Sequence, residues 1–216
     1  MEITINPSSK KWWIVGGILI LVVVIFVMSS GAKKAPPTQS TFTHATRGPS
    51  DAVMVIREYS DLQCPACGAA QAPLLEFWKK HQDEVRWEAN NFPLPQHKNA
   101  MSAANAAECA LDQDKYWQFA DVVFEKQSEW SDLADPMPKF KEYMATVGGD
   151  AGKMEACAKA QTHADKIAQD KKDGEAAGIT GTPTFFVNGN RFVGGMTADA
   201  WEQGLASIKA NLGPRK

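Results

Sequence analysis

A stretch without any charged residue lies between Lys11 and Lys33, and residues 12–28 within it would be apolar on every face of a helix. A buried helix of a water-soluble domain keeps a polar stripe, whereas a helix in lipid needs about 20 apolar residues to cross the hydrocarbon. The two tryptophans that begin this stretch and the lysines at both ends suit the membrane interfaces. The sequence therefore predicts one N-terminal transmembrane anchor at residues 12–30, preceded by a cytoplasmic N-terminus at residues 1–11.

A cleaved secretory signal peptide is the alternative, because Ser30, Gly31 and Ala32 form an acceptable small-residue cleavage site. Both interpretations place the rest of the chain outside the cytoplasm, since no comparable apolar run follows residue 34. We expect a single-pass protein of the cell membrane whose remaining part is periplasmic or extracellular.

A linker is predicted at residues 31–47, because residues 35–41 are polar, contain two prolines and offer nothing to pack. One domain is predicted from residue 48 to residue 216. The whole chain has 23 basic and 25 acidic residues, and the part after residue 34 is the more acidic, with a net charge of −5. Without clustered positive charge, nucleic acid is not an expected partner.

The predicted domain alternates strands and helices. Strands are expected at residues 52–59 and 85–92, a hairpin at 184–187 and 190–193 around Asn188-Gly189, and helices after Cys64, at 100–111, through 116–124, at 138–147, 151–177 and from Thr197 to about 212. We expect Pro73 to kink the first of these helices. The order is strand, helix, strand, a helical insertion at about residues 97–178, hairpin and helix, which indicates an α/β fold.

The chemistry is concentrated in Cys64-Pro65-Ala66-Cys67, where a strand runs into the start of a helix. The free N–H groups of a first helical turn favour the thiolate of Cys64, and a thiolate stabilised in this way is a good leaving group. An oxidised pair of this kind is readily reduced by a substrate thiol. The motif therefore predicts dithiol–disulfide exchange.

The cysteine pair has two other interpretations. Cys64 and Cys67 could form a purely structural disulfide, or they could join Cys109 and Cys157 in a zinc site of four cysteines. The zinc site is disfavoured because the second two cysteines are far apart in sequence. The histidines are also scattered, at His44, His81, His97 and His163.

The chain resembles the DsbA-like thiol:disulfide oxidoreductases of the bacterial envelope over about residues 47–212. The similarity rests on residues 58–67, on Phe92-Pro93-Leu94-Pro95, on the alanine-rich segment that ends at Cys109, and on residues 181–189. It implies a thioredoxin fold with an inserted helical subdomain, activity without an organic cofactor or a metal, and catalytic roles for residues around Cys64 and Cys67.

The resemblance assigns those roles to three further residues. It implies that Thr182-Pro183 is a cis peptide bond facing the cysteine pair, although on sequence alone Pro183 would simply end a loop. It implies that Glu58 is a buried acid that relays the proton of Cys67, whereas the alternative is an exposed carboxylate on an edge strand.

Cys109 and Cys157 are expected to pair in an oxidising compartment, and some relatives carry such a second, structural disulfide. A relay pair that feeds electrons to the first pair is the competing interpretation. The expected function is oxidation of cysteines in exported proteins, with reoxidation by a membrane quinone-linked partner.

Two departures from the family pattern keep the direction of exchange open. Ala66 stands where strong oxidases often have His, and Thr182 is also seen in isomerase-like relatives. A reductase or isomerase using the same site is therefore an alternative, and a metal-binding or chaperone module without turnover is an alternative of another class.

Overall fold

The computed structural model describes residues 44–212. The predicted anchor, its alternative as a signal peptide and most of the predicted linker lie outside these residues. Among the helices that are described, none combines the length and the apolar character needed to cross a membrane.

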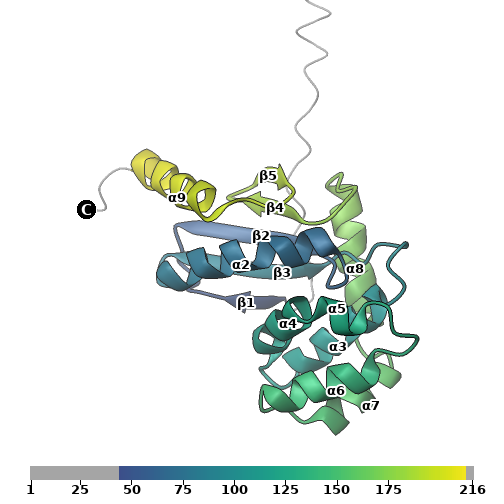
Figure 1. The fold of residues 1–216 in the computed structure, drawn as a ribbon. Coiled ribbons are helices and arrows are strands. Elements are labelled where there is room, and N and C mark those ends of the chain that lie inside the picture. The colour runs from purple at the N-terminus through teal and green to yellow at the C-terminus, as the bar shows by residue number, and fades with distance from the viewer. Residues whose placement is uncertain (1–43, 213–216) are drawn as a thin grey trace, which may run out of the picture. The chain divides into compact units, whose positions relative to one another are not determined.

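A five-stranded mixed sheet forms the centre of the fold, in the order β1-β3-β2-β4-β5. Its strands are β1 (Ala45–Arg47), β2 (Met54–Ser60), β3 (Val85–Asn91), β4 (Thr184–Val187) and β5 (Asn190–Val193). β2 and β3 are parallel and the other neighbours are antiparallel. The parallel pair requires a crossover, which α2 (Pro65–Lys80) supplies. α2 lies over the sheet beside the C-terminal helix α9 (Ala198–Leu212), as Figure 1 shows.

The insertion between β3 and β4 is helical, as predicted. Its helices are α3 (Ala100–Leu111), α4 (Tyr116–Glu125), α5 (Gln127–Trp130), α6 (Met137–Thr146), α7 (Ala151–Lys159) and α8 (Ala164–Ala176). Figure 1 shows α3 to α7 grouped at one end of the sheet. Small residues cover most of α3, and nearly all of them are buried, so neighbouring helices approach it closely.

Two sequence predictions are wrong in detail. The predicted linker at residues 31–47 includes β1, which pairs antiparallel with β3 and buries Ala45. The single predicted helix at residues 151–177 is two helices, because the chain turns at Gln161, whose φ of 52° lies in the left-handed region. No glycine or proline marks this turn in the sequence.

The alternation of side chains along β2 divides the core. Met54 and Ile56 point toward α2 and α9, where they pack with Phe77 and Trp201. Tyr59 packs on the opposite face, in a cluster with Phe186 of β4, with Phe92 after β3 and with residues that follow α8. Because Glu58 is two residues from Ile56, it points toward α2 and lies beneath its N-terminal part.

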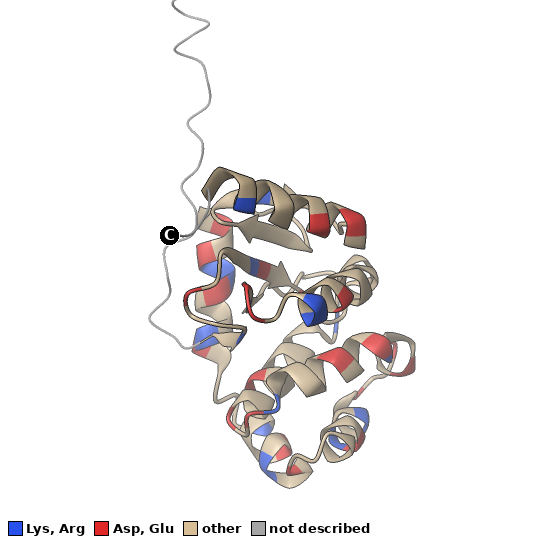
Figure 2. Cartoon of the chain, turned by 90° about the vertical axis from the view of Figure 1, so that its left-hand side faces the viewer, with Lys and Arg blue, Asp and Glu red and all other residues tan. Residues whose placement is uncertain are grey.

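The hairpin and the last helix begin as the sequence predicts. Asn188 and Gly189 both have positive φ, at 45° and 82°, as the tight turn between antiparallel strands requires. The Thr197 hydroxyl accepts a hydrogen bond from the N–H of Ala200 at 3.2 Å and so caps α9. Acidic and basic residues are interspersed along the described helices in Figure 2.

Candidate active site

The two cysteines of the motif lie where β2 leads into α2. Cys64 is the N-cap residue of α2, Pro65 occupies the first turn, and Cys67 follows one turn later. Both cysteines are free thiols; Cys67 is fully buried and Cys64 is 6% exposed. Proline fits this position because its nitrogen has no proton to leave unpaired. The pair therefore presents one sulfur near the surface and keeps the other inside.

The pKa values of the two thiols are shifted in opposite directions. A hydrogen bond from Cys67 is the largest cause that lowers the pKa of Cys64, and the Thr182 side chain and the N–H groups of Cys67 and Ala66 lower it further, to about 5. Burial raises the pKa of Cys67 well above its ordinary value, and the hydrogen bond with Cys64 raises it more. At neutral pH the reduced pair thus holds one thiolate and one thiol.

The Thr182–Pro183 peptide bond is cis, and it faces the cysteine pair. The carbonyl oxygen of Thr182 lies 3.6 Å from Cys64 Sγ. The loop is held by the Thr184 hydroxyl, which donates to the Gly181 carbonyl at 2.8 Å, and by the N–H of Gly194, which donates to the Pro183 carbonyl at 2.9 Å.

Glu58 is buried on a central strand, with 2% of its surface exposed, and not on the edge strand of the alternative interpretation. Gln71 Nε2 donates to one carboxylate oxygen at 2.8 Å, and Trp87 Nε1 donates to the other at 2.9 Å. Burial nevertheless dominates and raises the pKa of Glu58 to about 7. A carboxyl group that titrates near neutrality can give or take a proton during exchange.

A cavity of about 20 Å³ adjoins Glu58 and is also lined by Ser60 and Asp121. A space of this size with polar walls has room for one water molecule. The Asp121 side chain is 32% exposed, so the cavity lies between the buried acid and a group in contact with solvent.

Arg47 lies close to this acid, although the sequence assigned it to a linker. Its guanidinium carbon is 3.8 Å from the ring centre of Trp87 and 4.1 Å from that of Trp117, and its Nη1 is 3.7 Å from the Asp121 carboxylate. Burial lowers the pKa of Arg47 to about 10. The positive charge of Arg47 in turn lowers the pKa of Glu58 and so offsets part of the effect of burial.

The loop before Cys64 is anchored by Asp61, which sequence reasoning did not single out. One carboxylate oxygen accepts from the N–H of Gln63 at 2.8 Å. The other accepts from the N–H of Leu94 at 2.9 Å and lies 2.7 Å from His97 Nδ1. These contacts give a structural reason for the Phe92-Pro93-Leu94-Pro95 motif, whose backbone holds the loop.

The helical insertion also holds this loop. Gln127 Nε2, from α5, donates to the carbonyl oxygens of Leu62 at 2.8 Å and of Cys64 at 3.0 Å. Gln63 Nε2 donates to the Ser131 carbonyl at 2.9 Å. Sequence reasoning missed Gln127 because its partners are more than 60 residues away and glutamine carries no local signal.

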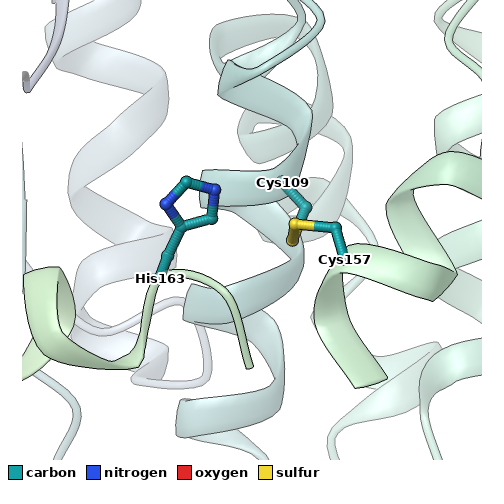
Figure 3. A group of neighbouring side chains, drawn as sticks. All are labelled: Cys109, Cys157 and His163. Atoms are coloured by element: carbon teal, nitrogen blue, oxygen red, sulfur yellow. A yellow bond between two sulfur atoms is a disulfide. The ribbon is translucent and has the colours of Figure 1, made fainter. Parts of the chain in front are cut away.

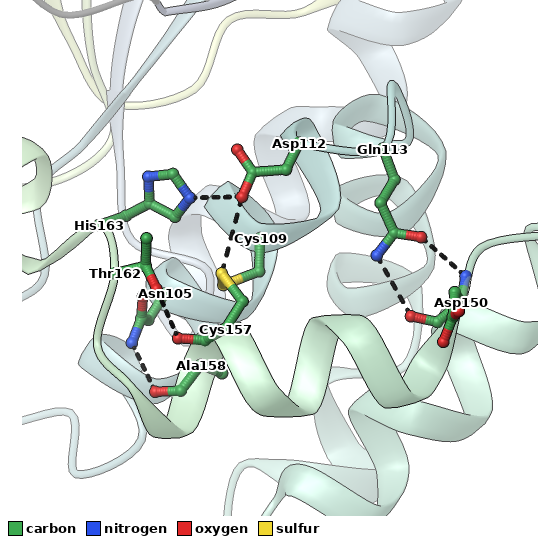
Figure 4. Close-up of a disulfide and its surroundings, with 9 residues drawn as sticks. All are labelled: Asn105, Cys109, Asp112, Gln113, Asp150, Cys157, Ala158, Thr162 and His163. Carbon is green, nitrogen blue, oxygen red and sulfur yellow. Dashed lines mark hydrogen bonds and ion pairs between the residues drawn. A yellow bond between two sulfur atoms is a disulfide. The ribbon is translucent and has the colours of Figure 1, made fainter.

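A disulfide joins Cys109 of α3 to Cys157 of α7, with Cα atoms 5.9 Å apart (Figure 3). These two cysteines are therefore paired with each other, and the zinc site of four cysteines is not formed. Asp112 and His163 surround the bridge, with His163 Nε2 and Asp112 Oδ2 2.8 Å apart (Figure 4).

A buried charged cluster joins α3 and α8 to the end of β3. Lys166 Nζ donates to Glu108 and to Asp170, both at 2.8 Å. Asn91 Nδ2 donates to the same two carboxylates. This cluster was not predictable from the sequence, because a charged helix such as α8 ordinarily faces solvent.

Comparison with known proteins places this geometry in a family. The family model described as Thioredoxin matches residues 40–206. Among curated proteins, the Na(+)/H(+) antiporter NhaA 3 of Salinispora tropica is 31% identical over 175 residues, which are 76% of this chain and 24% of that protein. NhaA 1 of Mycolicibacterium vanbaalenii is 34% identical over 155 residues, 68% of this chain and 24% of that protein. The chain spans about a quarter of the length of these relatives.

Solved structures show the same fold. BdbD of Bacillus subtilis has a TM-score of 0.69 at 21% identity, covering 84% of this chain and 100% of that one. α-DsbA1 of Wolbachia pipientis has a TM-score of 0.70 at 20% identity, covering 80% and 94%. DsbA of Chlamydia trachomatis has a TM-score of 0.71 at 18% identity, covering 82% and 97%. The chain belongs to the thioredoxin family and has the fold of its DsbA-like members.

Proposed function

We propose that this protein is a thiol:disulfide oxidoreductase that oxidises cysteines of exported proteins from a membrane-anchored position. One observation carries the proposal: the two cysteines at the start of α2 are opposite in character. The pKa of Cys64 is lowered to about 5, whereas burial raises the pKa of Cys67. Because Cys64 lies near the surface and Cys67 is fully buried, Cys64 is the sulfur that a substrate can attack. Its low pKa then makes Cys64 the better leaving group when the oxidised substrate is released.

In the oxidising direction the cycle begins with a disulfide between Cys64 and Cys67. A substrate thiolate attacks Cys64 Sγ, the bond to Cys67 breaks, and Cys67 leaves as a thiolate that takes a proton. We propose that Glu58 supplies that proton, because it is a buried acid with a pKa of about 7 that adjoins a small cavity with room for one water molecule. We assign Glu58 this relay role.

The second half of the cycle releases the substrate. A second substrate thiolate attacks the substrate sulfur of the mixed disulfide, and Cys64 departs as a thiolate. Two electrons have then passed from the substrate to the enzyme, and one substrate disulfide has formed. Thr182 and cis-Pro183 lie beside Cys64 and offer backbone groups to an extended substrate segment.

The stability of the reduced form supports the oxidising direction. The attacking cysteine has a pKa of about 7 in thioredoxin, a reductant, and about 3.5 in DsbA, a strong oxidant. A value of about 5 for Cys64 lies between them. Stabilisation of the thiolate stabilises the reduced enzyme and makes its disulfide more oxidising. The value supports oxidation. Reductase or isomerase activity is the alternative.

The equilibrium with reduced and oxidised glutathione at neutral pH tests this proposal. We expect a potential well above the value of about −270 mV for thioredoxin. The pair of Cys109 and Cys157 is followed separately by mass spectrometry of alkylated peptides, and Cys64→Ala is the inactive control. A potential near that of thioredoxin would refute the oxidase direction and leave a reductase.

A separate experiment tests where the protein is located and how its cysteine pair is reoxidised. We propose a single-pass anchor in the N-terminal segment and a membrane quinone-linked partner that reoxidises the cysteine pair. Reduced protein in membranes should regain its disulfide when a quinone is added, and a form that lacks residues 1–34 should regain it more slowly. Equal rates would remove the requirement for the anchor.

A further inference from the structure

We propose that the second pair of cysteines becomes a zinc site when it is reduced, with Cys109, Cys157, His163 and Asp112 as ligands. This site is separate from the redox pair, and the inference does not depend on the function proposed above. Within residues 44–212, the two sulfurs and a nitrogen of His163 form a group whose atoms all lie within 4.8 Å of one another.

The positions of the four donors support this inference. Figure 3 shows the imidazole ring of His163 beside the two sulfurs, and Figure 4 adds the carboxylate of Asp112. Asp112 Oδ2 lies 2.8 Å from His163 Nε2 and 3.7 Å from Cys157 Sγ. In a zinc tetrahedron with bonds of 2.0–2.3 Å, neighbouring donor atoms are about 3.3–3.8 Å apart. Small adjustments of the side chains therefore suffice once the sulfurs are separate.

The elements that carry these donors come from three parts of the insertion. Cys109 lies in the last turn of α3 and Asp112 caps its C-terminus, Cys157 lies in α7, and His163 is the N-cap residue of α8. A structural disulfide requires neither an imidazole nor a carboxylate at its sulfurs. Two thiolates, one imidazole and one carboxylate form a donor set that zinc accepts.

The exposure of the four ligands suits a metal ion that can enter and leave the site. Cys109 is buried, whereas Cys157 is partly exposed, and the side chains of His163 and Asp112 are 20% and 50% exposed. Zinc can therefore reach the site from solvent, while the fold holds Cys109 in place.

The chemistry balances with a dithiol as reductant. The dithiol gives two electrons and two protons to the disulfide of Cys109 and Cys157 and becomes a cyclic disulfide itself. Zinc then binds the two cysteines as thiolates, and the two protons are released to solvent. When a disulfide compound such as the oxidised dithiol takes two electrons back from the two thiolates, the bond between Cys109 and Cys157 forms again and the metal is released. The site is therefore a zinc site only in the reduced protein.

Cobalt(II) is the probe, because its visible absorption reports tetrahedral coordination and bonds to sulfur. The full chain carries Cys64→Ala and Cys67→Ala, so that the redox pair cannot bind metal, and it is reduced with a dithiol that is removed before titration. We expect one cobalt per reduced chain, displaced by zinc, and none in the oxidised chain. His163→Ala and Asp112→Ala should each weaken binding by about tenfold or more.

A matched control is available in His81. Its side chain is 22% exposed and lies 2.8 Å from a carboxylate oxygen of Glu202, much as His163 lies beside Asp112, but it is not in the cysteine cluster. His81→Ala should leave cobalt binding unchanged. Equal effects of His81→Ala and His163→Ala would overturn the assignment of His163.

Thermal unfolding is a second test, which still applies if reduction loosens the helical insertion. Zinc should raise the unfolding temperature of the reduced chain and leave that of the oxidised chain unchanged. An absence of tetrahedral cobalt bands, or a reduced chain that zinc does not stabilise, would refute the site.

Discussion

The pH dependence of the redox potential gives the strictest test of the asymmetric cysteine pair. Reduction of the disulfide between Cys64 and Cys67 takes up two protons when both products are thiols, and one proton when Cys64 stays a thiolate. The pKa of Cys64 is lowered to about 5, and the pKa of Cys67 is raised. Varying the pH between about 3 and 9 therefore crosses the titration of Cys64 but not that of Cys67.

The magnitude follows from these values. Each proton taken up by a two-electron couple contributes about 30 mV per pH unit. The potential should fall by about 59 mV per unit below pH 5 and by about 30 mV per unit above it. With an ordinary cysteine pKa of about 8.5 as reference, the thiolate of Cys64 stabilises the reduced form about 100-fold at pH 7. This factor corresponds to about 3 kcal/mol, or about 60 mV. The contribution grows from pH 5 to pH 8.5 and is lost as the pH falls through 5.

The assay combines two measurements on the same samples. The ultraviolet absorbance of the thiolate in reduced protein gives the pKa of Cys64, and equilibration with glutathione at each pH gives the potential. The side chain of Thr182 lowers the pKa of Cys64. Thr182→Val removes its hydroxyl group and keeps a branched residue before Pro183, so this substitution should raise the pKa of Cys64. Cys67→Ala should raise it further, because Cys67 is the largest cause of the shift.

A break in slope near pH 8 to 9 would refute the reasoning, since it would mean that the helix and Cys67 do not stabilise the thiolate. A break near pH 5 that Thr182→Val leaves in place would instead refute only the part assigned to Thr182. Glu58→Gln, measured in parallel, identifies any additional bend near pH 7.

Three further predictions concern the surroundings of the pair. Because burial raises the pKa of Glu58 to about 7, its ionisation should destabilise the fold as pH rises from about 4.5 to 7, by up to about 3 kcal/mol. Unfolding of Glu58→Gln in urea should lack this loss, and its exchange rate should lose the inflection near pH 7; unchanged profiles would remove the relay role. Replacing Cys109 and Cys157 with Ser opens a loop of 48 residues and should lower the free energy of unfolding by about 4 kcal/mol. Exchange at Cys64 should persist, and its loss would favour the relay interpretation. Lys166→Met leaves two buried carboxylates without their cation and should cost about 3–5 kcal/mol in chemical denaturation, whereas a cost below about 1 would show that the cluster contributes little.

Local patterns in the sequence predicted much of the framework. The β-rich segment before Cys64, Pro65 in the first turn and Asn188-Gly189 in the hairpin each act on neighbouring residues, and the structure has the strand, helix and turn they predict. The helical insertion and the α/β order of the elements were also predictable from local patterns, and the structure has both. The end of the predicted linker was wrong because β1 is three residues long and is stabilised by pairing with β3, which its own composition does not reveal.

The site was only partly predictable. The sequence identified the reactive cysteines because strand-to-helix position and spacing are local properties. It did not reveal that Arg47 would stack on Trp87 close to Glu58, that Gln127 would hold the loop of Cys64, or that His163 would lie beside a distant disulfide. These contacts join residues far apart in the chain, and the pKa of a buried acid depends on how many of its neighbours exclude water. The sequence by itself therefore determined which atoms can react, whereas tertiary packing decided their protonation and their partners.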